Sequence, residues 1–207
     1  GTRIVVFDAY LVHVDVPIDG ELALQLAQPR DHLPLDGRPV AGGAGDNAAT
    51  AIGAGTVAEG QGFVSLGTSG VIFAATDRYL PRPESAVHAF CHALPGMWHQ
   101  MSVILSASAA LEWLAGVLNA RAADLTQDLG PLQTPGTALF LPYLSGERTP
   151  HNDALAKGVL AGLTPTTDRA ALTRAVLEGV AFALADNLTA LRAAGARASM
   201  AIKPNTP

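Results

Sequence analysis

The chain has 207 residues, of which 49% are hydrophobic and 15% are charged, and its formal net charge is −5. This composition is typical of a globular protein with a sizeable core, in one domain or two small ones, and it excludes a disordered chain. The negative charge argues against nucleic acid as a partner, and no apolar stretch approaches the ~20 residues that span a membrane.

The N-terminal part of the chain predicts strands and then a short helix. Apolar runs at residues 3–7 and 11–18 favour a β-hairpin, and residues 20–37 are typical of a short helix with a loop. Residues 47–58 favour a helix, with Asp46 as its N-cap.

The middle of the chain predicts antiparallel strands. Residues 62–66 and 71–76 are apolar runs on either side of a tight turn, which indicates a hairpin. Residues 86–93 and 97–100 predict a second pair of strands.

The last part of the chain predicts two helices and two more strands. Residues 102–119 have the apolar spacing of an amphipathic helix, and residues 138–144 and 158–163 are apolar runs typical of buried strands. A long helix is predicted to begin at Asp168 and to end at Gly195. Strand hairpins followed by long helices favour an α/β fold in which helices pack on a strand-rich sheet.

Asp46 and Asn47 follow a glycine-rich segment at the start of a predicted helix. Gly42, Gly43 and Gly45 would let the backbone approach a ligand closely. From the spacing alone, a helix cap is the simpler interpretation of Asp46, and a general base beside a hydroxyl-bearing substrate is the alternative.

The turn Gly67-Thr68-Ser69-Gly70 combines hydroxyls with consecutive backbone N–H groups. Such a turn suits a terminal phosphate group, although an ordinary β-turn uses the same residue types. A hydrolase nucleophile elbow is disfavoured, because Val71 stands where the second glycine of that motif would be and a strand follows.

Three histidines lie close together in the sequence, at His88, His92 and His99. Their spacing suits no zinc site, so we predict no metal centre and expect these rings to form core hydrogen bonds. The single cysteine, Cys91, excludes an internal disulfide and indicates a reducing cytoplasm.

Two further features have alternative interpretations. Glu147 and Arg148 could form an ion pair that orients a loop near a cleft, or they could be solvated surface residues. Trp113 could contact an adenine ring, but its apolar spacing favours a core position.

Five motifs occur in order along residues 37–195, about three quarters of the chain. They are Ala-Gly-Gly-Ala-Gly-Asp-Asn at 41–47, Ser-Leu-Gly-Thr-Ser-Gly at 65–70, Ala-Val-His-Ala-Phe-Cys-His-Ala-Leu-Pro at 86–95, Phe-Leu-Pro-Tyr-Leu-Ser-Gly-Glu-Arg-Thr-Pro-His-Asn at 140–152, and the segment 157–179. Together they resemble the C-terminal half of the FGGY carbohydrate kinases, most closely the members that act on xylulose.

This resemblance implies an actin-like ATPase (ribonuclease H-like) fold of two lobes and the ATP-dependent phosphorylation of D-xylulose to D-xylulose 5-phosphate. It implies Asp46 as the catalytic base and a sugar contact, Asn47 as a sugar ligand, and Gly67, Thr68, Ser69 and Gly70 as the phosphate-binding turn. ATP and Mg²⁺ would be required, with Mg²⁺ held mostly by the phosphates, and a homodimer is common among such proteins.

The resemblance also divides the chain. Residues 1–36 would be a remnant of the first, sugar-binding lobe, and residues 37–207 would form the second, nucleotide-binding lobe, incomplete at its C-terminal end. We therefore expect the chain by itself to be inactive. The alternatives are an FGGY kinase for glycerol, gluconate or another ketose, or a non-catalytic actin-like nucleotide-binding module, which would not need Asp46 as a base.

Overall fold

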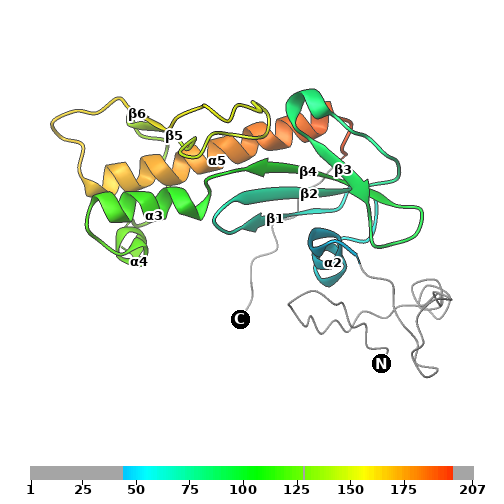
Figure 1. Cartoon of the computed structure of the whole chain (residues 1–207). Coiled ribbons are helices and arrows are strands. Elements are labelled where there is room, and N and C mark those ends of the chain that lie inside the picture. Colours follow the sequence, from blue (N-terminus) through cyan, green and yellow to red (C-terminus); the bar gives the residue numbers. More distant parts are fainter. Residues whose placement is uncertain (1–43, 128, 198–207) are drawn as a thin grey trace, which may run out of the picture.

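The structure is a computed structural model that describes residues 44–127 and 129–197 (Figure 1). The hairpin predicted over residues 3–18, the loop after it and the predicted lobe boundary lie outside the described residues. The described elements in chain order are α2 (Asp46–Gly53), β1 (Gly62–Leu66), β2 (Gly70–Thr76), the 3-10 turn η1 (Pro83–Ser85), β3 (His88–Cys91), β4 (Trp98–Ile104), α3 (Ser108–Val117), α4 (Ala122–Gln127), β5 (Leu139–Leu141), β6 (Val159–Ala161) and α5 (Arg169–Ala193).

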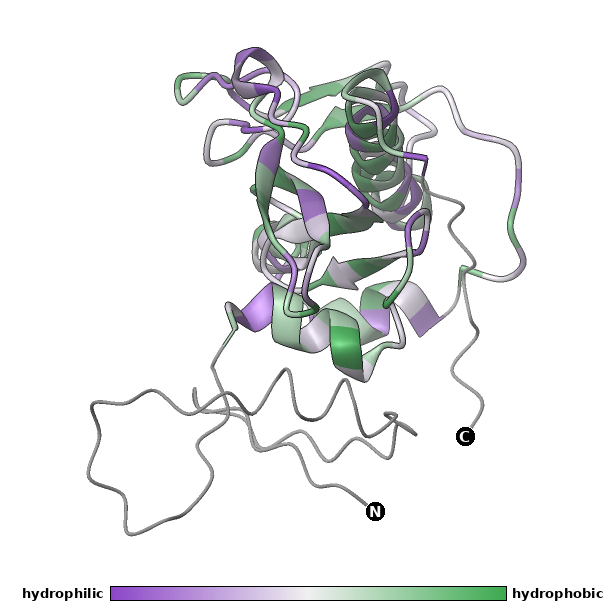
Figure 2. Cartoon of the chain, turned by 90° about the vertical axis from the view of Figure 1, so that its right-hand side faces the viewer, coloured by the Kyte–Doolittle hydropathy of each residue, from purple (hydrophilic) through white to green (hydrophobic). Residues whose placement is uncertain are grey.

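The predicted hairpins form one antiparallel sheet with the strand order β1-β2-β4-β3. The long helix α5 lies along one face of this sheet, and α2 lies under the other (Figure 1). Because side chains alternate along a strand, Ile72 of β2 packs with Leu191 of α5, while its neighbour Phe73 packs with Ala51 of α2. We call these the α5 face and the α2 face. An end-on view shows hydrophobic colour along α5 and the central strands (Figure 2).

The helix predicted over residues 102–119 is wrong at its start. Residues 102–104 continue β4, where they pair with residues 70–72 of β2, and α3 begins only at Ser108. Val103 and Ile104 are β-branched and fit a pleated sheet well. Pairing with β2 therefore decides the structure of a segment whose spacing alone is also compatible with a helix.

The helix α2 ends at Gly53 and is shorter than predicted. Gly55 has a positive φ of 72°, and the N–H of Thr56 donates to the carbonyl of Ala51 at 2.8 Å. This turn redirects the chain toward β1, so the residues up to 58 cannot continue the helix.

Trp113 of α3 is not a core residue. Its side chain is 38% exposed, and one face of the ring stacks on Phe140 with 5.5 Å between ring centroids and 14° between ring planes. The buried positions of α3 are Ala110, Leu114 and Ala115. Apolar spacing therefore identified the helix, but Trp113 lies at the edge of its buried side.

The second sheet is a two-stranded antiparallel pair, β5 and β6, packed on α5 (Figure 1). The strand predicted over 138–144 is shorter because Pro142, which has no N–H, follows Leu141. Gly179 lets α5 lie directly on β5, since a Cβ there would overlap the carbonyl of Phe140.

The predicted boundaries of the long helix are confirmed. Asp168 is the N-cap of α5, and its Oδ1 accepts from the N–H of Ala171 at 2.8 Å. Gly195, with a φ of 96°, follows its C-terminal end. In the part of the chain that the structure describes, no helix is long and apolar enough to cross a membrane.

Aromatic and imidazole rings form a cluster on the α2 face. His99 is buried and stacks on Phe73, with 4.4 Å between ring centroids and 18° between ring planes, and His92 lies edge-on to Phe73 at 5.8 Å. Burial, and to a smaller extent the neighbouring His92, lower the pKa of His99 to about 4. The fold therefore holds His99 as a neutral ring.

This cluster predicts a loss of stability in mild acid. The unfolded chain binds a proton at His99 near pH 6.5, whereas the folded chain binds it only near pH 4. The free energy of unfolding should therefore fall as the pH drops from about 6.5 to 4, with His99 contributing about 2 kcal/mol between pH 7 and pH 5. Urea unfolding of the wild type and of His99→Phe should show a smaller pH dependence in the variant. Equal pH dependences would contradict the prediction.

Candidate functional site

Asp46 is the first residue of α2, and the prediction that it caps this helix is wrong. The N-cap is Gly45, and no side chain caps the helix. The Oδ1 atom of Asp46 instead accepts from the backbone N–H of Asn47 at 2.7 Å and from its side-chain Nδ2 at 3.2 Å. The carboxylate therefore turns toward its own neighbour and not toward the N–H groups one turn further along the helix.

The Asp46 carboxylate is exposed and has one oxygen free. Asn47 is half-buried, and its backbone N–H and its Nδ2 both donate to Oδ1. Within the described residues, Oδ2 of Asp46 accepts no hydrogen bond. This pairing orients the carboxylate and leaves Oδ2 available to a substrate.

The turn between β1 and β2, residues 67–70, is called the bend here. The carbonyl groups of its first three residues are all used: the carbonyl of Ser69 accepts from the N–H of Gly67 at 2.9 Å, and those of Gly67 and Thr68 accept from the start of α3. Ser108 donates its N–H at 3.0 Å and its hydroxyl at 2.6 Å to Gly67, and Ala107 donates its N–H at 2.9 Å to Thr68.

The donors of Thr68 and Ser69 in the bend differ from its carbonyl groups. Within the described part of the chain, the N–H groups and hydroxyls of Thr68 and Ser69 donate to no carbonyl or side chain, and Thr68 is exposed. Gly70 sets the bend against the rest of the fold, since a Cβ there would lie 2.8 Å from Cγ1 of Ile104 and 3.3 Å from Cβ of Ala107. The bend thus presents donors and is backed by β4 and α3.

The sheet connects Asp46 with the bend. Ala51 of α2 packs on Phe73 of β2, which is the strand that follows the bend. Among the described residues, no hydrogen bond or ion pair joins Asp46 to the bend. The roles predicted for Asp46, Asn47 and the bend therefore stay predictions.

The sequence left two interpretations of Glu147, an ion pair with Arg148 or a solvated surface residue, and the structure tests both. Glu147 is 2% exposed, so the surface interpretation is wrong for this residue, whereas Arg148 is exposed. No ion pair joins the two among the described residues. The Oε1 atom of Glu147 accepts from the N–H of Leu105 at 3.0 Å and from the N–H of Arg148 at 2.7 Å. Burial raises the pKa of Glu147 above its usual range. The only feature of the sequence that could have indicated the burial of Glu147 is its place between Gly146 and Pro150, in a loop with apolar strands on both sides.

The histidines form no metal site with their neighbours. His92 accepts at Nδ1 from the N–H of Leu94 at 3.1 Å, and its Nε2 lies 3.1 Å from the carbonyl of Thr56, which fixes a neutral ring with its hydrogen on Nε2. Within residues 44–127 and 129–197, no three histidine, cysteine, aspartate or glutamate side chains come together as possible metal ligands.

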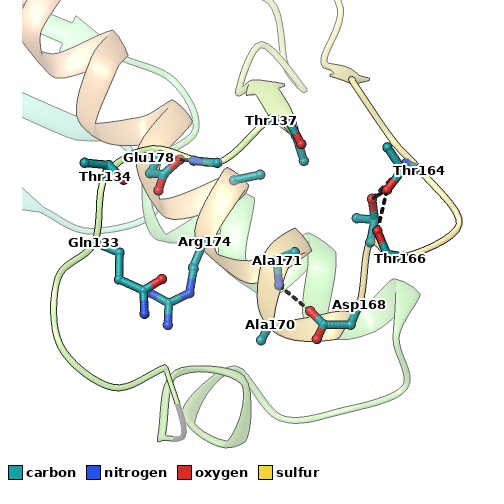
Figure 3. Close-up of a pocket in the computed structure, with 14 residues that line it drawn as sticks. Gln133, Thr134, Thr137, Thr164, Thr166, Asp168, Ala170, Ala171, Arg174 and Glu178 are labelled. Carbon is teal, nitrogen blue, oxygen red and sulfur yellow. Dashed lines mark hydrogen bonds between the residues drawn. The ribbon is translucent and has the colours of Figure 1, made fainter.

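A polar hollow of about 340 Å³ lies where the start of α5 meets the loops at 133–138 and 164–168 (Figure 3). Its charged side chains are already engaged: Arg174 donates to the carbonyl of Leu129, and Glu178 accepts from the N–H of Gly136 at 3.3 Å. It contains none of the residues predicted for the site, and we assign it no ligand.

Comparisons of this chain with protein families and with known sequences both give carbohydrate kinases. The model of the FGGY family of carbohydrate kinases, C-terminal domain, matches residues 62–203. The chain is 49% identical to the xylulose kinase of Klebsiella pneumoniae over 193 residues, which are 90% of this chain and 37% of that protein. It is 52% identical to the xylulose kinase of Escherichia coli (strain K12) over 160 residues, 76% of this chain and 33% of that protein.

Among solved structures, the chain is similar to a xylulose kinase from Brucella ovis, with a TM-score of 0.77 and 62% identity over 78% of this chain and 34% of that one. The chain spans about a third of the length of these relatives. The structural likeness confirms the predicted actin-like α/β fold, and the family model covers more than half of the chain. The chain therefore belongs to the FGGY family of carbohydrate kinases.

Proposed function

We propose that the complete protein carrying this chain transfers the terminal phosphoryl group of ATP to D-xylulose, giving D-xylulose 5-phosphate. The relatives that match most of this chain are named xylulose kinases, which favours xylulose over glycerol, gluconate or another ketose. The division at residues 36 and 37 into two lobes is part of the same proposal, with the sugar and the nucleotide meeting between the lobes.

The observation that carries this proposal is that the carbonyl groups of Gly67, Thr68 and Ser69 are all bonded within the fold, whereas the N–H groups and hydroxyls of Thr68 and Ser69 have no partner among the described residues. A phosphate group has only acceptor oxygens, so a turn that offers free donors suits it. In phosphoryl transfer, positioning and charge stabilisation of this kind supply most of the catalysis.

Asp46 supplies the base in this mechanism. Its Oδ2 takes the proton of the 5-hydroxyl of xylulose while the hydroxyl oxygen forms a bond to the γ-phosphorus, and the bond to the leaving oxygen of ADP breaks with its electron pair. Asn47 donates to Oδ1 from its backbone N–H and from its Nδ2, which leaves its own amide oxygen to accept from a neighbouring sugar hydroxyl.

The remaining requirements follow from this assignment. The described residues do not fit a protein-held metal, since no three suitable side chains meet there, and Mg²⁺ would be bound mainly by the nucleotide phosphates and water. We further propose a cytoplasmic protein, in keeping with its single cysteine, that forms a homodimer.

The substrate is tested by measuring ADP release from the complete protein with xylulose, ribulose, glycerol and gluconate. We expect the highest kcat/KM for xylulose by at least about tenfold, since hydroxyl-specific contacts discriminate strongly between polyols. A higher value for glycerol or gluconate would replace xylulose as the substrate, and no ADP release with any of them would favour the non-catalytic module.

Replacement of the proposed base should abolish turnover without unfolding the protein. Asp46→Asn keeps the size of the side chain but removes the proton acceptor, so kcat for xylulose should fall by roughly 10²–10⁴-fold. Asp77→Asn, at an exposed position after β2, is the matched control and should keep the wild-type rate. An unchanged kcat in Asp46→Asn would remove this residue from the mechanism.

Removal of the hydroxyls of the bend should weaken nucleotide binding specifically. Thr68→Ala and Ser69→Ala each delete one donor to the phosphate, and the KM for ATP should rise by roughly three- to tenfold in each. Ser65→Ala, on β1 and also exposed, serves as the control. If both variants keep the wild-type KM for ATP, the hydroxyls of the bend do not contact the phosphate.

A further inference from the structure

Glu147 is buried in a way that packing does not explain. Its side chain is 2% exposed, and within the described residues its Oε2 has no hydrogen-bond partner. Burying a carboxylate with only two backbone N–H partners costs free energy, and an apolar side chain would avoid that cost. An apolar side chain could not, however, accept the two hydrogen bonds that Oε1 accepts.

The loop that contains Glu147 takes the place of β3 along the edge of β4. The β3–β4 pairing ends at His88 and Met101. Beyond it, Thr149 donates its N–H to the carbonyl of Val103 at 3.0 Å, and its Oγ1 accepts from the N–H of Val103 at 3.1 Å. Glu147 then accepts the next N–H on this edge, that of Leu105, at 3.0 Å. A carboxylate thus completes the hydrogen bonding of β4 where its neighbouring strand has ended.

Leu105 lies between residues that contact the bend. Ile104, just before it, contacts Gly70, and Ala107 and Ser108, just after it, donate to the carbonyls of Thr68 and Gly67. Any shift at Leu105 therefore reaches the backbone that orients the donors of the bend.

We propose that Glu147 is a positioning residue for the nucleotide: its Oε1 holds Leu105, and through Leu105 the start of α3 and the phosphate-binding bend. This proposal rests on the proposed function. The charge of Glu147 does not contact the phosphate; what matters is an acceptor oxygen at the right reach.

Two variants separate reach from charge. Glu147→Gln keeps an acceptor oxygen at the same reach and removes the charge, whereas Glu147→Asp keeps the charge and withdraws the oxygen by one methylene. In the complete protein, Glu147→Asp should raise the KM for ATP about tenfold, the loss of one hydrogen bond, and leave the KM for xylulose unchanged. Glu147→Gln should stay within about twofold of the wild type. Glu112→Asp, exposed on α3, is the control for shortening a glutamate in this region.

Amide hydrogen exchange provides a second readout that does not require activity. In Glu147→Asp, the N–H groups of Leu105, Ala107 and Ser108 should exchange faster than in the wild type. If the complete wild-type protein releases no ADP but exchange is still faster in Glu147→Asp, the proposed function is overturned and the role of Glu147 in supporting the bend remains. Unchanged exchange, an unchanged KM for ATP, or a tenfold increase in Glu147→Gln but not in Glu147→Asp would each overturn the proposal for Glu147.

Discussion

The start of α3 and the bend between β1 and β2 satisfy each other's backbone groups. A helix begins with N–H groups that have no partner in the helix itself, and α3 has Ala107 as its N-cap, which has no side chain to cap them. The carbonyls of Gly67 and Thr68 take that place. In consequence, the helix N-terminus is not free to bind an anion, and the free donors belong to the bend.

The sheet keeps this arrangement in place because its central strand is buried on both sides. β2 begins at Gly70 and packs through Ile72 against α5 and through Phe73 against α2. Burial of such side chains contributes about 1.5–3 kcal/mol each, far more than the hydrogen bonds of an exposed turn. The same strand therefore anchors the bend and, through α2, the segment that begins with Asp46.

Buried polar groups join the remaining elements to β4. Thr149 donates its hydroxyl to the carbonyl of Ala86 at 3.0 Å, and the Nδ2 of Asn187 donates to the carbonyl of Thr149 at 2.7 Å. Together with Glu147, these side chains connect β4, the segment before β3, and α5. Polar groups in a core are unfavourable when unpaired, so this network favours one arrangement of the loop over others.

The sequence by itself determined the family, the hairpin around residues 67–70, and both ends of α5, because these depend on local patterns: alternation, a capping aspartate and a terminating glycine. Only the tertiary structure decided that residues 102–104 are strand, that Gly45 and not Asp46 caps α2, and that Glu147 is buried. The pairing of Asp46 with Asn47 is local, whereas the other two features depend on which distant backbone groups need a partner. That need arises only when the sheet, the loop and the helices are packed together.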